Sequence, residues 1–397
     1  MSDPSTGPWL TIIGIGEDGL AGLSEASRNA LARAETVFGG ERHLKLAGID
    51  GRGKPWPVPF DATCVLARRG RPTAVLASGD PFWHGAGGTL ASKLSPDEWI
   101  AHPSPSTFSL AASRLGWPLE STLCIGLHAA PFERLVPLLA RGARIICLVR
   151  DAKAAADLAA WLAAQGFGPS RLWTLSALGG SRECITESKA DPYASGSVTS
   201  PVAVAIEADG APGLPRASGM ADDLFQHDGQ ITKRPMRALA LSALAPRPGE
   251  RLWDIGAGSG SISIEWALAG GSASAIEARE DRAKNIRTNT EAFGLAHKIG
   301  IIAASAPAAL SSLEKPDAVF VGGGLDAAMF DAIWQLLPKS TRLVAHSVTL
   351  ETEALLVDLQ RKHGGDLMRI EISHAAPLGS FRSWDASRPV VQWSVVK

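Results

Sequence analysis

The feature that most constrains this chain is a glycine-rich run that directly follows an apolar strand. The run is Arg251-Leu-Trp-Asp-Ile-Gly-Ala-Gly-Ser-Gly, and a second short apolar stretch, Ala273–Ile276, ends beside Glu277. Glycines let a backbone turn tightly and approach a ligand closely. An acidic residue at the end of the next strand can hold a ribose diol. The spacing predicts a nucleoside-cofactor site in an open α/β sheet.

Two interpretations of this site compete. A dinucleotide fold requires Gly-x-Gly-x-x-Gly, whereas Gly256, Gly258 and Gly260 alternate. The alternating form resembles the first motif of the seven-stranded S-adenosylmethionine-dependent methyltransferases, in which Glu277 would bind the ribose hydroxyls. The structural alternative is a loop that only turns a strand into a helix. The complete order of strand, turn, helix, strand and acid favours the cofactor site.

Composition bounds the remaining possibilities. With 397 residues the chain exceeds one ordinary core, so we expect two domains. Hydrophobic residues make up 45% and charged residues 20%, which fits soluble globular domains. The formal net charge is −1 and no long basic run occurs, so electrostatics gives no case for binding nucleic acid or an anionic membrane.

The sequence also carries no sign of export or of a metal site. No run of eighteen apolar residues occurs, and the N-terminus lacks the basic start and apolar middle of a signal peptide. The four cysteines are far apart, with no histidine partner at metal-ligand spacing. We therefore expect a cytoplasmic protein with reduced thiols and no metal.

Proline and glycine recur every two or three residues between Gly210 and Asp223, which prevents both helix and strand. This predicts a linker over 210–223, between domains 1–209 and 224–397. In the second domain, two late strands without a helix between them indicate an antiparallel pair at the edge of a parallel sheet of seven strands. The five earlier strand candidates begin near Arg251, Ser272, Gly300, Asp317 and Thr341.

The first half has glycine signatures of its own. An apolar strand from Trp9 runs into Gly14-Ile-Gly16, and Ser24 is a good N-cap for a helix that extends to Ala34. A second strand, Thr73–Ala77, leads directly into Ser78-Gly-Asp-Pro. Such turns lie at the carboxyl ends of strands, where open α/β sheets bind ligands, although each alone could be an ordinary strand-to-helix turn.

These motifs resemble two known families. Gly14-Ile-Gly-Glu-Asp-Gly-Leu, Ser78-Gly-Asp-Pro and Pro103-Ser-Pro-Ser-Thr-Phe-Ser-Leu-Ala-Ala resemble successive motifs of the tetrapyrrole methylases of corrin synthesis, over nearly all of residues 8–208. The second half, including Gln230-Ile-Thr-Lys-Arg-Pro-Met-Arg, is similar to the decarboxylating corrin methyltransferases. The implied fold class is α/β throughout: a tetrapyrrole methylase fold of two subdomains, followed by a Rossmann-like sheet of seven strands.

The resemblance also implies an activity. Each half would bind its own S-adenosylmethionine, and the substrate would be a corrinoid tetrapyrrole. The first half would methylate carbon 5 of the macrocycle, and the second half would decarboxylate the acetate of ring C and methylate carbon 15. Both domain types are expected to self-associate, so we expect a homo-oligomer.

The cofactor-binding candidates follow from the glycine turns and from the resemblance. Asp254 would orient the glycine loop or the amino-acid end of the cofactor, or would serve only as a carboxylate that satisfies backbone donors of a helix. Ala306 lies where the second family contacts the adenine. The full set is Gly14, Gly16, Ser78, Gly79, Asp80 and Ser106 in the first half, and Asp254, Gly256, Gly258, Gly260, Glu277 and Ala306 in the second.

The catalytic candidates are placed by chemistry. A substrate that carries many carboxylates calls for cations, and Lys233, Arg234 and Arg237 precede the first strand of the second domain. The alternative for these residues is a solvated helix start. Decarboxylation would use at most one acid, for which His346 is a candidate by its position just past a strand, although a lone histidine is more often structural.

Two other functions stay open. In one, only the second half is an active methyltransferase, on another small molecule or on RNA, and the neutral charge speaks against RNA. In the other, the chain is a cofactor-binding scaffold without turnover. Release of carbon dioxide would separate the leading hypothesis from both.

Overall fold

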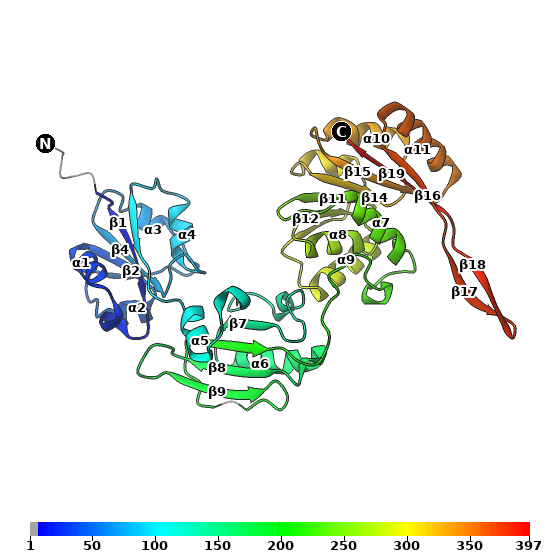
Figure 1. The fold of residues 1–397 in the computed structure, drawn as a ribbon. Coiled ribbons are helices and arrows are strands. Elements are labelled where there is room, and N and C mark those ends of the chain that lie inside the picture. Colours follow the sequence, from blue (N-terminus) through cyan, green and yellow to red (C-terminus); the bar gives the residue numbers. More distant parts are fainter. Residues whose placement is uncertain (1–6, 195) are drawn as a thin grey trace. The chain divides into compact units, whose positions relative to one another are not determined.

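The computed structural model describes residues 7–194 and 196–397, which fold into two compact units (Figure 1). The first unit comprises the described residues through Phe132 together with Leu138–Pro212. The second unit comprises Glu133–Pro137 together with Gly213–Lys397. The chain thus passes from one unit to the other inside the Pro- and Gly-rich segment 210–223.

The first unit begins with a five-stranded sheet in the order β3-β2-β4-β1-β5. All of its strand pairs are parallel, so the carboxyl ends of β1 and of its neighbours β4 and β5 meet at one edge. The predicted helix after β1 is confirmed, because Ser24 caps α1 by accepting a hydrogen bond from the Ser27 amide. The elements are β1 (Leu10–Ile15), α1 (Glu25–Arg33), β2 (Thr36–Gly39), α2 (Glu41–Leu46), β3 (Gly53–Pro55), α3 (Thr63–Leu66), β4 (Thr73–Ser78), α4 (Ala86–Ala91) and β5 (Trp99–His102).

The rest of the first unit is a second, mostly antiparallel sheet in the order β6-β7-β10-β8-β9. Phe108 of α5 packs in a core cluster with Trp173 of β8, which fastens α5 to this sheet. Its central strand, β10, begins at Val202 and is buried along almost its whole length. The elements are α5 (Thr107–Leu115), β6 (Leu123–Gly126), β7 (Arg144–Val149), α6 (Ala152–Leu162), β8 (Arg171–Ser176), β9 (Cys184–Lys189) and β10 (Val202–Glu207).

The second unit contains the predicted seven-stranded sheet, in the order β13-β12-β11-β14-β15-β19-β16. Its first five strands are parallel, and β19 runs antiparallel between β15 and β16, which confirms the antiparallel edge pair. The strands are β11 (Arg251–Ile255), β12 (Ser272–Ile276), β13 (Ile299–Ile302), β14 (Ala318–Val321), β15 (Arg342–Ser347), β16 (Asp366–Ile370) and β19 (Val390–Val396). The helices are α7 (Arg234–Leu244), α8 (Ser261–Leu268), α9 (Glu280–Ala292), α10 (Ala327–Leu336) and α11 (Leu350–His363).

Helices cover both faces of this sheet, so the residues of its central strands β11 and β14 are almost all buried. Successive residues of β11 point to opposite faces, so Leu252 packs in the cluster that contains Ile264 of α8, and Trp253 packs in the cluster that contains Ile333 of α10. Both β11 residues are fully buried. This two-sided core holds the glycine turn after β11 on a rigid strand.

A β-hairpin between β16 and β19 was not among the predicted elements. Its strands, β17 (Ser373–Leu378) and β18 (Phe381–Ala386), form a separate two-stranded sheet that projects from the second unit (Figure 1). The hairpin has no core of its own, because Leu378, Phe381 and Trp384 are all exposed. A two-stranded hairpin is marginally stable alone in water.

A buried ion pair fastens the start of the second unit to its sheet. The Arg237 side chain is fully buried and its Nε donates to the Glu265 carboxylate at 2.6 Å. Glu265 also accepts hydrogen bonds from the amides of Gly219 and Met220, at 2.6 and 3.0 Å. The last residues of the predicted linker are therefore held on α7 and α8.

Replacement of Glu265 by alanine should destabilise the second unit by about 3 to 5 kcal/mol, because it removes the carboxylate closest to the buried Arg237 charge. Hydrogen exchange of the α7 and α8 amides in the full chain would measure this loss. Asp358→Ala, which removes an exposed ion pair with Arg361, is the matched control and should change exchange little. Equal protection in the Glu265→Ala and Asp358→Ala variants would contradict a role for this pair.

Candidate functional site

The turn after β11 adopts a backbone that only glycine reaches without strain. Gly256, Gly258 and Gly260 have φ angles of 68°, 60° and 74°. Space around the first two is open, since a Cβ at Gly258 would have its nearest neighbour, the Gln230 carbonyl oxygen, 3.8 Å away. Backbone conformation and not packing thus requires glycine there, and the turn leaves room for a ligand.

Glu277 ties the end of β12 to this turn. Its side chain is buried, and its Oε2 accepts a hydrogen bond from the Gly258 amide at 2.9 Å. Its Oε1 accepts from the Arg279 amide at 3.0 Å. Each carboxylate oxygen has two lone pairs, so both can still accept from a ligand hydroxyl.

Asp254 lies beneath the turn, at the end of β11, and is almost completely buried. Its Oδ2 accepts from the amide and hydroxyl of Ser263, at 3.2 and 2.7 Å. Its Oδ1 is buried and has no hydrogen-bond partner among the residues that the structure describes. Burial, with a smaller contribution from the nearby Glu277 charge, raises the pKa of Asp254 to about 6. A donor on a bound ligand would offset the cost of the unsatisfied oxygen.

A segment that precedes α7 is clamped beside the glycine turn by α9. The buried Asn289 exchanges hydrogen bonds with the backbone of Gln226, and its Nδ2 also donates to the Ser259 carbonyl at 2.9 Å. Arg282 donates to Asp228 at 2.9 Å and to the Gln230 side chain at 2.5 Å. Sequence reasoning missed Asn289 and Arg282, because their partners lie 30 to 63 residues away along the chain.

The three catalytic candidates of the second half differ in burial. Arg237 is enclosed by the protein, and its remaining donors reach Asp222, the Thr232 carbonyl and the Met220 carbonyl. It is therefore neither on a groove surface nor at a solvated helix start. Lys233 is exposed, with its Nζ 3.9 Å from Asp222 Oδ2. The structure pairs Lys233 and Arg237 through this shared carboxylate.

His346 is buried inside β15. Its Nε2 is 2.9 Å from Gln392 Oε1, and its ring meets Phe320 edge-on with 5.1 Å between centroids. Burial lowers the pKa of His346, so the ring is neutral near pH 7. Ala306, the adenine candidate, follows β13 and packs against the core cluster that contains Trp253.

In the first unit, three strand ends meet at a tight backbone junction. The Ser104 amide donates to the Gly79 carbonyl at 3.1 Å, and its hydroxyl donates to the Gly14 carbonyl at 2.8 Å. A Cβ atom at Gly14 would collide with the Gly79 carbonyl oxygen, so this close approach requires glycine. The junction places the turns after β1, β4 and β5 side by side. Nearby, Gly16 follows β1, and Asp80 accepts from the Phe82 amide within its own turn.

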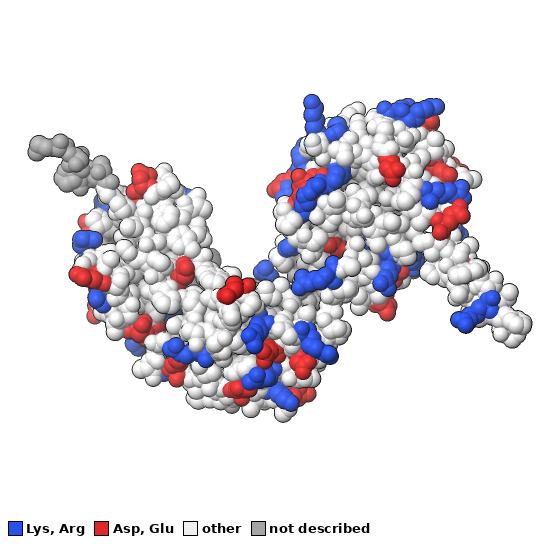
Figure 2. Space-filling view, in the orientation of Figure 1, with Lys and Arg blue, Asp and Glu red and all other residues white. Residues whose placement is uncertain are grey.

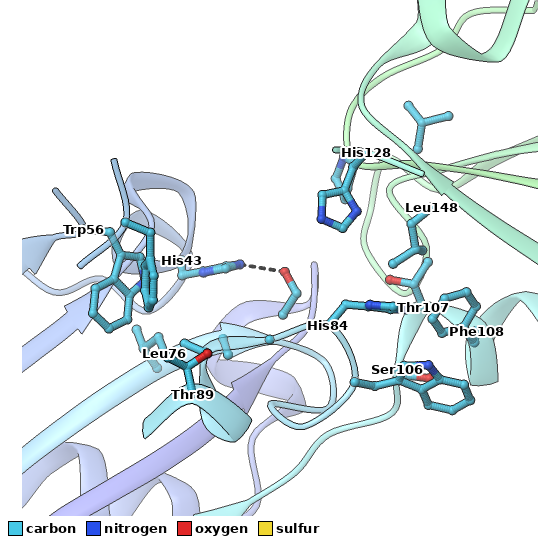
Figure 3. Close-up of a pocket in the computed structure, with 18 of the residues that line it drawn as sticks. His43, Trp56, Leu76, His84, Thr89, Ser106, Thr107, Phe108, His128 and Leu148 are labelled. Atoms are coloured by element: carbon cyan, nitrogen blue, oxygen red, sulfur yellow. Dashed lines mark hydrogen bonds between the residues drawn. The ribbon is translucent and has the colours of Figure 1, made fainter. Parts of the chain in front are cut away.

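Ser78 and Ser106 line a cavity of about 480 Å³ in the first unit (Figure 3). Ser106 is also the N-cap of α5, where it accepts from the Ser109 amide at 3.1 Å. Ser78 Oγ is 2.8 Å from His43 Nε2 and accepts from Arg42 at 2.9 Å. Burial, aided by the Arg42 charge, lowers the pKa of His43 to about 4.

Sequence reasoning missed the polar side chains around this cavity. Glu17 pairs with Arg42 and accepts from Arg182 at 3.0 Å, although Arg182 lies 165 residues further along the chain. His84 and His128 also line the cavity. They carry no local motif in the sequence, so only the fold brings them together.

Comparison with known proteins assigns each half to a family. Residues 9–191 match the tetrapyrrole (corrin/porphyrin) methylases, and residues 223–397 match the precorrin methyltransferase domain. Together the matches define the class, a tetrapyrrole methylase joined to a second methyltransferase domain. They also confirm the fold class that the sequence predicts.

The full-length relatives carry a more specific name. The precorrin-6Y C(5,15)-methyltransferase (decarboxylating) of a Sinorhizobium species is 46% identical, over 100% of this chain and 98% of the relative. The protein of that name from Mycobacterium tuberculosis is 38% identical, over 98% and 100%. A solved C-terminal domain of precorrin-6Y C5,15-methyltransferase from Rhodobacter capsulatus is 53% identical, over 46% of this chain and 100% of that domain, with a TM-score of 0.46. This chain belongs to the family of decarboxylating precorrin-6Y C(5,15)-methyltransferases.

Membership of a methyltransferase family implies S-adenosylmethionine as the methyl donor. Within residues 7–194 and 196–397, no three His, Cys, Asp or Glu side chains gather in a way that could hold a metal ion. In the same ranges, no helix combines the length and the apolar character that crossing a membrane demands.

Proposed function

We propose that this chain methylates precorrin-6B (reduced precorrin-6) at carbons 5 and 15 and decarboxylates the acetate of ring C, giving precorrin-8 in cobalamin biosynthesis. The observation that carries the proposal is the correspondence with the Sinorhizobium relative, which extends over practically the whole length of both chains. Both candidate sites lie at the carboxyl ends of parallel strands, where open α/β sheets bind ligands.

One S-adenosylmethionine would bind in each unit. In the second unit, the open glycine turn fits close backbone contact with the cofactor, and Glu277 would accept from its ribose. The unsatisfied Oδ1 of Asp254 fits a donor at its amino-acid end, and Ala306 would border the adenine. In the first unit, the turns at Gly14, Gly16, Gly79 and Asp80, with Ser78 and Ser106 on the cavity wall, would hold the second cofactor. When bound, the cofactor supplies an electrophilic methyl group on a sulfonium.

The remaining task of the protein is to orient the macrocycle and to exclude water. Lys233 and Arg234 are exposed at the start of α7, directly after the segment that lies beside the glycine turn. Lys233 and Arg234 would bind substrate carboxylates. The buried Arg237 would instead stabilise the segment before α7, through its hydrogen bond to the Thr232 carbonyl. His346 is enclosed by Gln392 and Phe320, which favours a structural role over that of an acid.

The function can be tested by mass spectrometry of precorrin-6B after incubation with S-adenosylmethionine and the full chain. We expect a gain of two methyl groups and the loss of carbon dioxide. Gly258→Val should abolish carbon-15 methylation and keep that at carbon 5, because a β-branched residue cannot adopt its positive φ without strain.

Gly249→Val is the matched control for this test. Gly249 also has a positive φ, 83°, and open surroundings, but it precedes β11 and so lies away from the turn. Cofactor binding without any change in the corrin would contradict the proposed function. That result would favour a scaffold or a methyltransferase of another small molecule.

Figure 2 shows charges of both signs interspersed over the visible face, which does not favour RNA as the substrate.

The pKa of Asp254 predicts a pH dependence for the second cofactor site. A donor or cation of the cofactor binds the ionised carboxylate, so affinity should fall as the pH drops below about 6. At pH 5 we expect affinity about tenfold weaker than at pH 7.5. Calorimetric titration of the full chain would measure it, and Asp254→Asn should remove the pH dependence. Affinity that is equal at both pH values for the unaltered chain would contradict this role.

The chain would form a homo-oligomer through the β17–β18 hairpin. Leu378 pairs across the hairpin with Phe381, while Trp384 pairs with Ala375, and these three large apolar side chains are 64%, 80% and 74% exposed. Within the described chain β17 and β18 pair only with each other, so both outer edges are open. A second copy of the same hairpin offers both an edge to pair with and an apolar surface to bury.

Combined replacement of Leu378, Phe381 and Trp384 by serine should lower the molar mass in solution, because it removes the apolar surface that a partner would cover. Light scattering after size exclusion would measure the mass. Val348→Ser with Leu350→Ser, at residues 63% and 79% exposed elsewhere in the second unit, is the control. An unaltered chain with the mass of one copy would contradict oligomer formation.

We also place the protein in the cytoplasm. All four cysteines are free in the structure, which suits a reducing compartment.

A further inference from the structure

Methylation at carbon 5 leaves a proton to be removed, and this consequence rests on the proposed function. Carbon 5 uses π electrons of the macrocycle to form the new C–C bond, while the C–S bond of the sulfonium breaks and its electron pair stays on sulfur. The C–H electron pair of carbon 5 then returns to the conjugated ring, and one proton departs. An acceptor close to the substrate would promote this last step.

Histidines are the candidates for this task in the cavity of the first unit. Among the described residues that line it, His43, His84 and His128 carry an imidazole, the side chain that serves most often as a general base. His43 is engaged with Ser78 and lies beside the Arg42 cation, which opposes uptake of a second positive charge. His84 and His128 are exposed toward the cavity, and Figure 3 shows them on the side away from His43.

These two histidines come from the two different sheets of the unit. His84 lies in the turn between β4 and α4, and His128 follows β6. Their ring centroids are 6.3 Å apart and the rings are nearly perpendicular, at 79°. His84 also lies 6.1 Å, centroid to centroid, from the Phe108 ring. The pair therefore spans the two walls that would face a bound macrocycle.

Two backbone features support this arrangement. His84 has a φ of 59°, a conformation that residues other than glycine seldom adopt and that concentrates at functional sites. Gly126 lies beside both rings, and a Cβ there would be 3.3 Å from the Cε1 atoms of His84 and of His128. The absence of a side chain at Gly126 thus leaves the space in which the rings face each other.

We propose that His84 and His128 form the proton-accepting pair of the carbon-5 methylation site. One imidazole accepts the proton that carbon 5 loses. The imidazolium then releases this proton to water at the mouth of the cavity. The wall beside His84 is aromatic, from Trp83 and Phe108, so the imidazole nitrogens of the pair are the proton acceptors where the macrocycle would lie.

The test compares methylation at the two carbons in the same full-length chain. With S-adenosylmethionine labelled with carbon-13 in its methyl group, each new methyl gives its own NMR signal, and the carbon-15 signal is the internal reference. The double variant His84→Gln/His128→Gln should lose about 100-fold in the carbon-5 rate, the range that general bases supply. The control is His102→Gln, which replaces a histidine of β5 in the same unit and should leave the carbon-5 rate unchanged.

Two further variants separate chemistry from folding. His128→Gly and His84→Gly, the latter compatible with a positive φ, open space for free imidazole, which should restore part of the carbon-5 rate. A structural role would show no such rescue. A carbon-5 rate within twofold of the unaltered chain in the double variant would overturn the inference while the proposed function stands. Absence of both methyl signals in the unaltered chain would instead overturn the proposed function.

Discussion

Parallel strand pairing is the constraint on which both candidate sites depend. In the first unit β1 lies between β4 and β5, and in the second unit β11 lies between β12 and β14, all in parallel register. Parallel strands end at the same edge, so turns that are far apart in sequence become neighbours. The hydrogen bond from the Gly258 amide to Glu277 and the bond from Ser104 to Gly14 are direct products of this register.

What the sequence predicted well is local or periodic. The capped helix after Ser24 and the seven strands of the second sheet depend on short-range patterns, because capping and apolar runs are written into adjacent residues. The glycine turn is predictable for the same reason, since its conformation excludes other residues whatever surrounds it. The glycine turn and Glu277 of this candidate site could thus be picked out from a segment of about 25 residues.

What the sequence could not show depends on partners that are distant along the chain. Asn289 belongs to no sequence motif, yet it links Gln226 to the glycine turn. The sequence around Arg237 suggests a surface cation, and only the structure shows its ion pair with the buried Glu265. The β17–β18 hairpin was not predicted from the sequence. A strand that is exposed on both faces lacks the alternation of apolar and polar residues by which strands are recognised. Each case is decided by tertiary structure and not by local preference.

The cavity and the backbone junction of the first unit differ in their capacity to change. At the junction, Gly14 cannot accept even one additional carbon atom, so evolution and engineering have almost no freedom there. The cavity wall is different, because Trp56 and Phe60 pack edge to face at 4.9 Å and Phe60 is half exposed. Their replacement would reshape the cavity in which we propose that the macrocycle binds, and would leave the backbone contacts intact. A new acceptor specificity would therefore evolve through aromatic residues of the wall, while the junction stays constant.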